Sequence, residues 1–150
     1  MMNYKNKLYL AYGSNLNLRQ MARRCPSAKA VGIAMLKDYQ LTFRKVATIE
    51  PFNGAETPVG IWEITPEDEL ALDRYEGYPN LYRKEIIDVE IKGIKIKAMV
   101  YIMNSGNPNF PNDNYFKTIA EGYANIGFDT VYLKEALNDT KSRMKQRKSM

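Results

Sequence analysis

A strand-like run of apolar residues ends abruptly in Gly13-Ser14-Asn15, within the segment LYLAYGSNL at residues 8–16. A strand that enters a turn and opens a helix leaves several backbone N–H groups without partners inside the helix. Such groups can bind an anion or a carbonyl oxygen that is acquiring negative charge. Gly13 permits close approach of the backbone, and Asn15 can cap the helix or adopt unusual dihedral angles. An ordinary strand-to-helix turn is the alternative interpretation.

This segment differs from a P-loop, because the second glycine and the Lys-Ser/Thr pair are missing. A small carboxylate or carbonyl ligand therefore fits the segment better than a triphosphate does.

A second candidate, Glu76, is the last residue before Gly77 in the segment LDRYEGYPNLY at 72–82. The negative end of the preceding helix disfavours a carboxylate, and cover from the neighbouring tyrosines would desolvate it, so both effects raise its pKa. A carboxyl group tuned to about 6–7 is suited to act as a general base. The alternative is a solvated glutamate at a fraying helix end.

Asp73 is the rival acid, since it lies three residues earlier on roughly the same helix face. A surface ion pair with its neighbour Arg74 explains it at least as well. Two carboxylates without further ligands make a weak metal site, so we expect neither a metal nor another cofactor.

The absence of histidine narrows the chemistry further. It excludes Ser-His and Cys-His nucleophilic systems and every His-ligated metal site. Any general base must be Asp, Glu, Lys, Tyr or the single cysteine, Cys25. One cysteine allows no intramolecular disulfide, and its place before Pro26 near the end of a predicted helix indicates a structural role.

Tyrosine is frequent, with 11 residues in the chain, and several lie beside the two candidate segments. Tyrosine supplies rigid apolar walls with a polar tip. We expect most of these residues in the core or at a pocket rim and two or three against a ligand. The tyrosines concerned are Tyr9, Tyr12, Tyr75, Tyr78, Tyr82 and Tyr115.

The elements that must position these residues follow from hydrophobic alternation and from turn signals. Thr65-Pro66 begins a helix that Gly77 ends, and hairpin turns are predicted at Lys37-Asp38 and Lys92-Gly93. A loop rich in Pro, Asn and Gly follows residue 49. The predicted strands are 7–12, 29–36, 39–45, 59–64, 82–91 and 94–103, and the predicted helices are 16–24, 66–76, 114–125 and 130–145.

Strands paired in hairpins with helices between them predict an α+β fold with a mostly antiparallel sheet. The helix between the first two strands allows one parallel crossover, so the sheet is expected to be mixed.

The composition fits one domain, with 150 residues, 45% hydrophobic and 26% charged. We place this domain at 1–140 and a basic tail at 141–150, because the tail carries five Lys or Arg residues and no acid. Without them 17 basic and 17 acidic residues remain, so the net charge of +5 belongs to the tail and nucleic acid is not expected as a partner. The tail is interpreted as a solvated, fraying helix end, with docking onto an anionic partner as the alternative.

No apolar run approaches the about 20 residues of a membrane span, and the first ten residues turn polar too early for a signal peptide. We therefore expect a cytoplasmic protein without a membrane partner. The size leaves a homodimer open.

Five motifs in order resemble the γ-glutamylcyclotransferase-like (AIG2-like) family, and the resemblance spans about residues 7 to 128. The motifs are YGSNL at 12–16, ATIEP at 47–51, VGIWEI at 59–64, LDRYEGYPNLYRK at 72–84 and YFKTIAEGYANIGF at 115–128. The resemblance implies a small α+β fold whose sheet curls into a barrel-like cavity with flanking helices.

The activity implied by the resemblance is closure of a γ-glutamyl group to 5-oxoproline, with release of an amine or amino acid. Glu76 is then the general acid/base. The backbone from Tyr12 through Gly13 and Ser14 to Asn15 holds the glutamyl group. Tyr82 and Tyr115 line the pocket and hydrogen-bond the substrate, and Tyr9 is a weaker match.

The alternative function is a non-catalytic protein that binds a small carboxylate or amine in the same cavity. The linker between Glu76 and Tyr82 varies in length in such families, and the basic tail has no counterpart in the resemblance. The sequence does not identify the leaving group.

Overall fold

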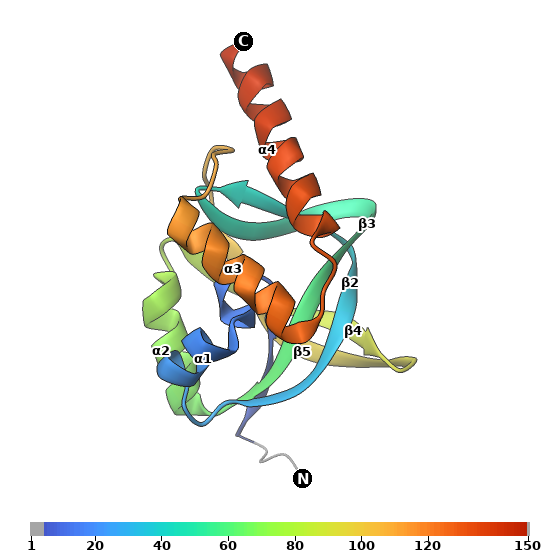
Figure 1. Ribbon diagram of the computed structural model, residues 1–150. Coiled ribbons are helices and arrows are strands. Elements are labelled where there is room, and N and C mark those ends of the chain that lie inside the picture. The colour runs from blue at the N-terminus through green and yellow to red at the C-terminus, as the bar shows by residue number, and fades with distance from the viewer. Residues whose placement is uncertain (1–4, 150) are drawn as a thin grey trace.

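Residues 5–149 are described by the computed structural model, which contains one five-stranded mixed sheet (Figure 1). The strand order is β2-β3-β1-β5-β4. β1 pairs antiparallel with β3 and parallel with β5, so the predicted α+β class and mixed, mostly antiparallel sheet are confirmed. The strands are β1 (Lys7–Ala11), β2 (Lys29–Arg44), β3 (Val46–Ile64), β4 (Tyr82–Ile91) and β5 (Ile94–Met103).

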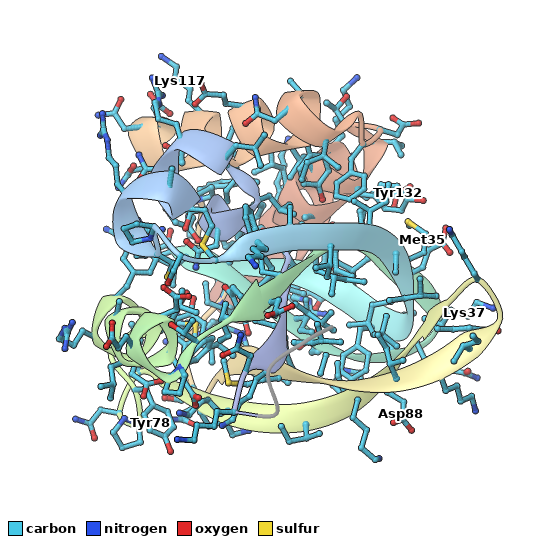
Figure 2. The ribbon with its side chains drawn as sticks, turned by 90° about the horizontal axis from the view of Figure 1, so that it is seen from below. Met35, Lys37, Tyr78, Asp88, Lys117 and Tyr132 are labelled. Atoms are coloured by element: carbon cyan, nitrogen blue, oxygen red, sulfur yellow. The ribbon has the colours of Figure 1, made fainter. Side chains whose placement is uncertain are left out.

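The sheet curls strongly but does not close into a barrel (Figure 2). Its two edge strands approach each other, and Lys37 Nζ of β2 lies 3.8 Å from Glu90 Oε2 of β4. The predicted hairpin at Lys92-Gly93 joins β4 and β5.

Helices cover one side of the curl, with α1 beside α2 and α3 running across the strands, while the far end of α4 projects from the body (Figure 1). The predicted caps of α2 are present: Thr65 and Asp68 form a reciprocal capping box, and Gly77 ends the helix with φ 67°. The helical elements are η1 (Ser14–Leu16, a 3-10 turn), α1 (Leu18–Arg24), α2 (Pro66–Glu76), α3 (Asp113–Ile126) and α4 (Val131–Lys148). Within residues 5–149, no helix combines the length and apolar character needed to cross a membrane.

The hairpin predicted at Lys37-Asp38 is wrong. Asp38 adopts φ 65° at a shift in register inside the continuous strand β2, and its Oδ1 accepts a hydrogen bond from Gly54 N at 3.0 Å. The chain reverses instead at Lys45, with φ 73°. The loop predicted after residue 49 is also wrong, because the segment is part of β3 and pairs with β2 on both sides of residues 52–55, which lie at the shift in register.

The helix predicted over 16–24 begins as η1 and continues as α1, and Asn17 rather than Asn15 caps α1 by accepting from Gln20 N at 3.1 Å. At the other end of the chain, residues 141–148 continue α4. Arg143 pairs there with Asp139 and with Glu50 of β3.

The core lies between the curled sheet and the helices, where η1 packs directly against α3. A Cβ atom on Gly122 of α3 would lie only 2.7 Å from Asn17 N and 2.8 Å from Leu16 C. Helix α3 therefore supports η1, and with it the segment that contains Gly13, Ser14 and Asn15.

Candidate active site

One cavity of about 200 Å³ lies where the end of β1, η1, the end of α2 and the first residues of β4 and α3 converge. The structure brings together all eight residues predicted for a site, although the role of each stays a prediction. The predicted residues that line it are Tyr9, Tyr12, Gly13, Ser14, Asn15, Glu76, Tyr82 and Tyr115. Five further residues complete the lining: Val46, Ala47, Tyr75, Leu81 and Tyr101.

Gly13 lies where the chain passes close to two other walls of the cavity. A Cβ atom at this position would meet Ala47 Cβ at 3.3 Å and Tyr115 Oη at 3.6 Å, so glycine lets the backbone pass close to these two residues. In the described part of the chain, the N–H groups of Ser14 and Asn15 have no backbone acceptor. They are available to a ligand at the opening of η1.

Side chains tie this segment to its surroundings. Asn15 Nδ2 donates to Tyr9 Oη at 2.9 Å, and Ser14 Oγ lies 2.8 Å from Tyr75 Oη. Arg24 donates to Asn15 Oδ1 and stacks over the Tyr75 ring, with its guanidinium carbon 3.4 Å from the ring centroid. Arg24 therefore joins η1 to the last turn of α2.

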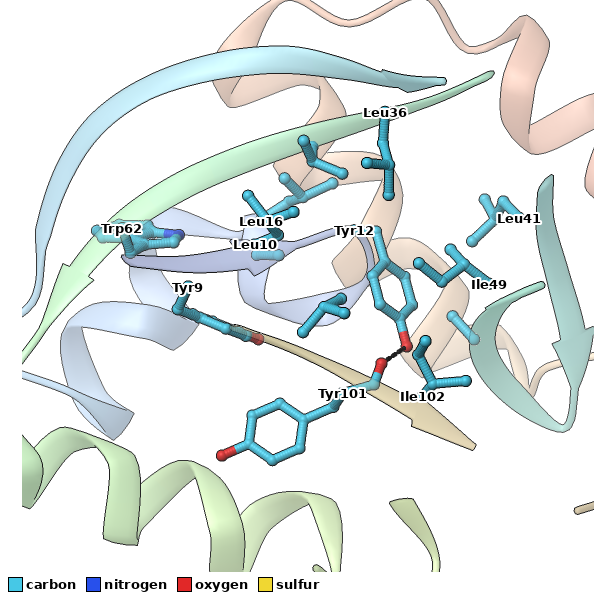
Figure 3. Packing of buried hydrophobic residues seen from close by; sticks show 14 of the residues in the cluster. Tyr9, Leu10, Tyr12, Leu16, Leu36, Leu41, Ile49, Trp62, Tyr101 and Ile102 are labelled. Carbon is cyan, nitrogen blue, oxygen red and sulfur yellow. Dashed lines mark hydrogen bonds between the residues drawn. The ribbon is translucent and has the colours of Figure 1, made fainter. Parts of the chain in front are cut away.

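Three tyrosines of the cavity differ in whether their hydroxyl hydrogen is already donated to the protein. Tyr12 Oη donates to the carbonyl of Tyr101 at 2.6 Å (Figure 3), and Tyr82 Oη donates to the carbonyl of Ala47 at 2.6 Å. Tyr115 Oη instead accepts from Ala47 N at 3.0 Å, so it keeps its own hydrogen for a ligand.

Asp73, the rival acid, does not line the cavity. Its carboxylate accepts from Tyr101 Oη at 2.6 Å and lies 3.1 Å from Lys84 Nζ. The ion pair expected with Arg74 is thus formed with Lys84. Within residues 5–149, no three Asp, Glu or Cys side chains are grouped to share a metal ion.

Glu76 is the one carboxylate among the described residues that lines the cavity; its side chain is half-buried and forms no hydrogen bond or ion pair within residues 5–149. Burial raises its pKa from 4.5 to about 7, while the positive charge of Arg24 opposes the shift. Burial also raises the pKa of the Tyr9, Tyr12, Tyr82 and Tyr115 hydroxyls. Glu76 is therefore the lining group suited to exchange protons near neutral pH.

Cys25, the remaining candidate base, is buried away from the cavity, and its thiol points to the carbonyl of Asp68 at 3.6 Å. Burial raises the pKa of this thiol to about 11, so it stays protonated near neutral pH.

The raised pKa of Glu76 predicts that the contribution of this residue to stability falls as pH rises. The folded state holds the Glu76 proton up to about pH 7, whereas the unfolded chain releases it near 4.5. The contribution of Glu76 to stability is therefore fully present below about pH 4.5 and is lost as pH rises through about 7. Between about pH 5 and about pH 8, the free energy of unfolding measured with urea should fall by up to about 2 kcal/mol more for wild type than for Glu76→Gln. If the free energy of unfolding of the two proteins changed with pH in the same way, Glu76 would not have a raised pKa in the folded protein.

The fold and the pocket together define a small α+β protein whose cavity, within the described residues, is lined by one half-buried acid and several tyrosines. The chain belongs to the gamma-glutamyl cyclotransferase, AIG2-like family, whose model matches residues 9–122.

Curated relatives and solved structures agree with this placement. The Homo sapiens gamma-glutamylcyclotransferase is 29% identical over 141 residues, which cover 83% of this chain and 74% of the relative. The Bos taurus gamma-glutamylcyclotransferase is 29% identical over 142 residues, covering 85% and 76%. A solved gamma-glutamyl cyclotransferase structure superposes with TM-score 0.77 at 27% identity, covering 87% of this chain and 86% of the other.

A more distant structure, YkqA from Bacillus subtilis, shares the fold with TM-score 0.75 at 22% identity, covering 92% of this chain and 55% of that one. The predicted family and fold are thereby confirmed, and the relatives support a γ-glutamylcyclotransferase-type enzyme.

Proposed function

We propose that this protein closes γ-glutamyl groups to 5-oxoproline. The α-amine of the glutamyl group attacks its own γ-carbonyl carbon, a new C–N bond forms, and the original amide C–N bond breaks to release an amine or amino acid. Because the nucleophile and the electrophile belong to one molecule, the pocket needs only to fold the substrate and to move protons.

The observation that carries the proposal is Glu76, a half-buried carboxylate in the cavity wall, without a hydrogen-bond partner within residues 5–149 and with a pKa of about 7. It takes a proton from the substrate ammonium, which frees the nitrogen lone pair for attack, and delivers that proton to the leaving nitrogen. The second proton of the attacking nitrogen follows the same route. Two protons leave one nitrogen and two reach the other, so the step balances.

In this proposal the backbone from Tyr12 to Asn15 holds the glutamyl group. The N–H groups of Ser14 and Asn15 have no backbone acceptor within residues 5–149, so they are available to the substrate carboxylate or to the nascent oxyanion.

The test is an assay of the purified protein with γ-glutamyl amino acids and γ-glutamyl amines, following 5-oxoproline by mass spectrometry, with Glu76→Gln as the blank. Product from wild type alone would establish the reaction and the base together. If every substrate stays intact while its addition raises the melting temperature, the cavity only binds, and the alternative of a non-catalytic binding protein holds.

The two pocket tyrosines that hold Ala47 should differ in their effect on catalysis. Tyr115 has a hydrogen to donate to the substrate, whereas Tyr82 gives its hydrogen to the Ala47 carbonyl. Tyr115→Phe is therefore expected to lower kcat/KM about 10-fold more than Tyr82→Phe. This ratio corresponds to the free energy of about one hydrogen bond to a charged group.

Steady-state kinetics of both variants measure this difference. Each variant removes one hydrogen bond to Ala47, and only the bond of Tyr82 is fully buried, so Tyr82→Phe should lose at least as much stability as Tyr115→Phe. Equal kinetic losses would show that Tyr115 serves the fold alone.

A further inference from the structure

The cavity has a polar closed end and an apolar open end. At the closed end the side chains are almost fully buried, as for Tyr9 at 3% exposure, Asn15 at 2% and Tyr82 at 4%. The most exposed lining residues are Tyr75, at 42%, and Leu81, at 45%, whereas Val46, Glu76 and Tyr115 are half-buried. The side chains of Tyr75 and Leu81, with that of Val46, form the rim of the cavity.

Leu81 is exposed but held firmly in place. Its N–H donates to the carbonyl of Gly77 at 2.8 Å, and its carbonyl accepts from Asn104 N at 3.0 Å. Asn104 Nδ2 also donates to the carbonyls of Pro79 and Asn80, at 2.8 and 2.9 Å. The backbone position of Leu81, and with it the place of this residue on the rim, is therefore set before any substrate arrives.

Tyr78, in the same segment, points to the outside of the molecule beside α2 (Figure 2) and does not line the cavity. Its ring lies 4.1 Å from Lys84 Nζ.

Two cationic side chains beside the cavity, Lys84 and Arg24, already have partners within the protein. Lys84 Nζ lies 2.7 Å from Glu69 and 3.1 Å from Asp73. Arg24 is bonded to Asn15 and stacked on Tyr75. The one charged side chain in the described lining is Glu76, which would repel a second carboxylate once it is ionised.

A γ-glutamyl substrate has a polar end, with its amine and carboxylate, and a variable end, the leaving group. The polar end matches the N–H groups and hydroxyls of the closed end, so the leaving group extends over the rim. We propose that the preferred leaving groups carry an apolar side chain, and that Leu81 is the residue that determines this preference. This inference rests on the proposed function.

Three γ-glutamyl dipeptides of nearly equal size test the proposal: those of leucine, asparagine and aspartate. The expected kcat/KM is about 10-fold higher for the leucine dipeptide than for the asparagine dipeptide, because partial burial of one aliphatic side chain is worth about 1.4 kcal/mol, and lowest for the aspartate dipeptide. Leu81→Asn should abolish the difference between the leucine and asparagine dipeptides.

Leu70→Asn is the matched control, since Leu70 is 58% exposed on α2 and does not line the cavity. It should keep the wild-type preference. Similar kcat/KM values for the three dipeptides in wild type, or a preference that survives Leu81→Asn, would overturn the inference while the proposed function stands. Absence of 5-oxoproline from all three would overturn the proposed function, and the inference with it.

Discussion

Replacing Glu76 with glutamine is expected to lower kcat by about 100- to 10,000-fold, the range that a positioned general acid or base contributes. Glutamine fills nearly the same volume but cannot accept and return a proton near neutral pH. No other lining side chain among the described residues can substitute, because the pKa values of the buried tyrosine hydroxyls are raised away from neutrality. Rates of 5-oxoproline formation by wild type and variant measure the loss.

Asp73→Asn is the control for this variant. Asp73 is the other acid of the same helix, but its carboxylate faces Lys84 and Tyr101 outside the cavity. Its kcat should stay within a few-fold of wild type. A Glu76→Gln protein with wild-type turnover, or an Asp73→Asn protein with the larger loss, would move the acid/base role away from Glu76.

Gly122→Ala is expected to lower the free energy of unfolding by about 1–3 kcal/mol, the usual cost of forcing extra atoms into a packed core. The new Cβ would meet the backbone of Leu16 and Asn17 at 2.7–2.8 Å, and backbone atoms have little freedom to move aside. The gain in helix propensity of up to about 1 kcal/mol is smaller than this clash. Because α3 supports η1, catalytic activity should fall together with stability.

Gly32→Ala provides the comparison, since no atom lies within 4 Å of the Cβ position at that exposed site in β2. Urea unfolding of both variants should show a loss for Gly122→Ala and little change for Gly32→Ala. If Gly122→Ala unfolds at the wild-type urea concentration, α3 and η1 can separate without cost, and the support inferred for the binding segment is absent.

Much of the site was predictable because its two main parts carry local signals. Gly13-Ser14-Asn15 interrupts an apolar strand, and Glu76 precedes a helix-ending glycine, so neither feature depends on distant contacts. Tyr101 was not predicted, because its place in the cavity arises from the parallel pairing of β5 with β1, which no local pattern encodes. Ala47 and Leu81 have apolar side chains typical of any core or rim, although Ala47 lies in the ATIEP motif that carries the family resemblance.

The wrong predictions of a hairpin at Lys37-Asp38 and of a loop after residue 49 have another physical cause. Lys37-Asp38 and the segment rich in Pro, Asn and Gly after residue 49 have turn-like composition, yet they lie opposite each other at a shift in register inside β2 and β3. Both segments are mostly exposed, so burial does not demand apolar residues there, and pairing overrides local propensity. The true reversal at Lys45 uses a residue that does not favour positive φ, so no sequence signal marks it.

The hydrogen bonds around Ala47 have a consequence for protein synthesis. Its N–H donates to a tyrosine of α3, and its carbonyl accepts from a tyrosine of β4. This part of the cavity wall therefore forms only when residues 47, 82 and 115 are all in place, and Gly13 lies close to residues 47 and 115. A nascent chain on the ribosome that still lacks residue 115 cannot form these contacts, so the cavity is complete only when part of the last third of the chain has emerged.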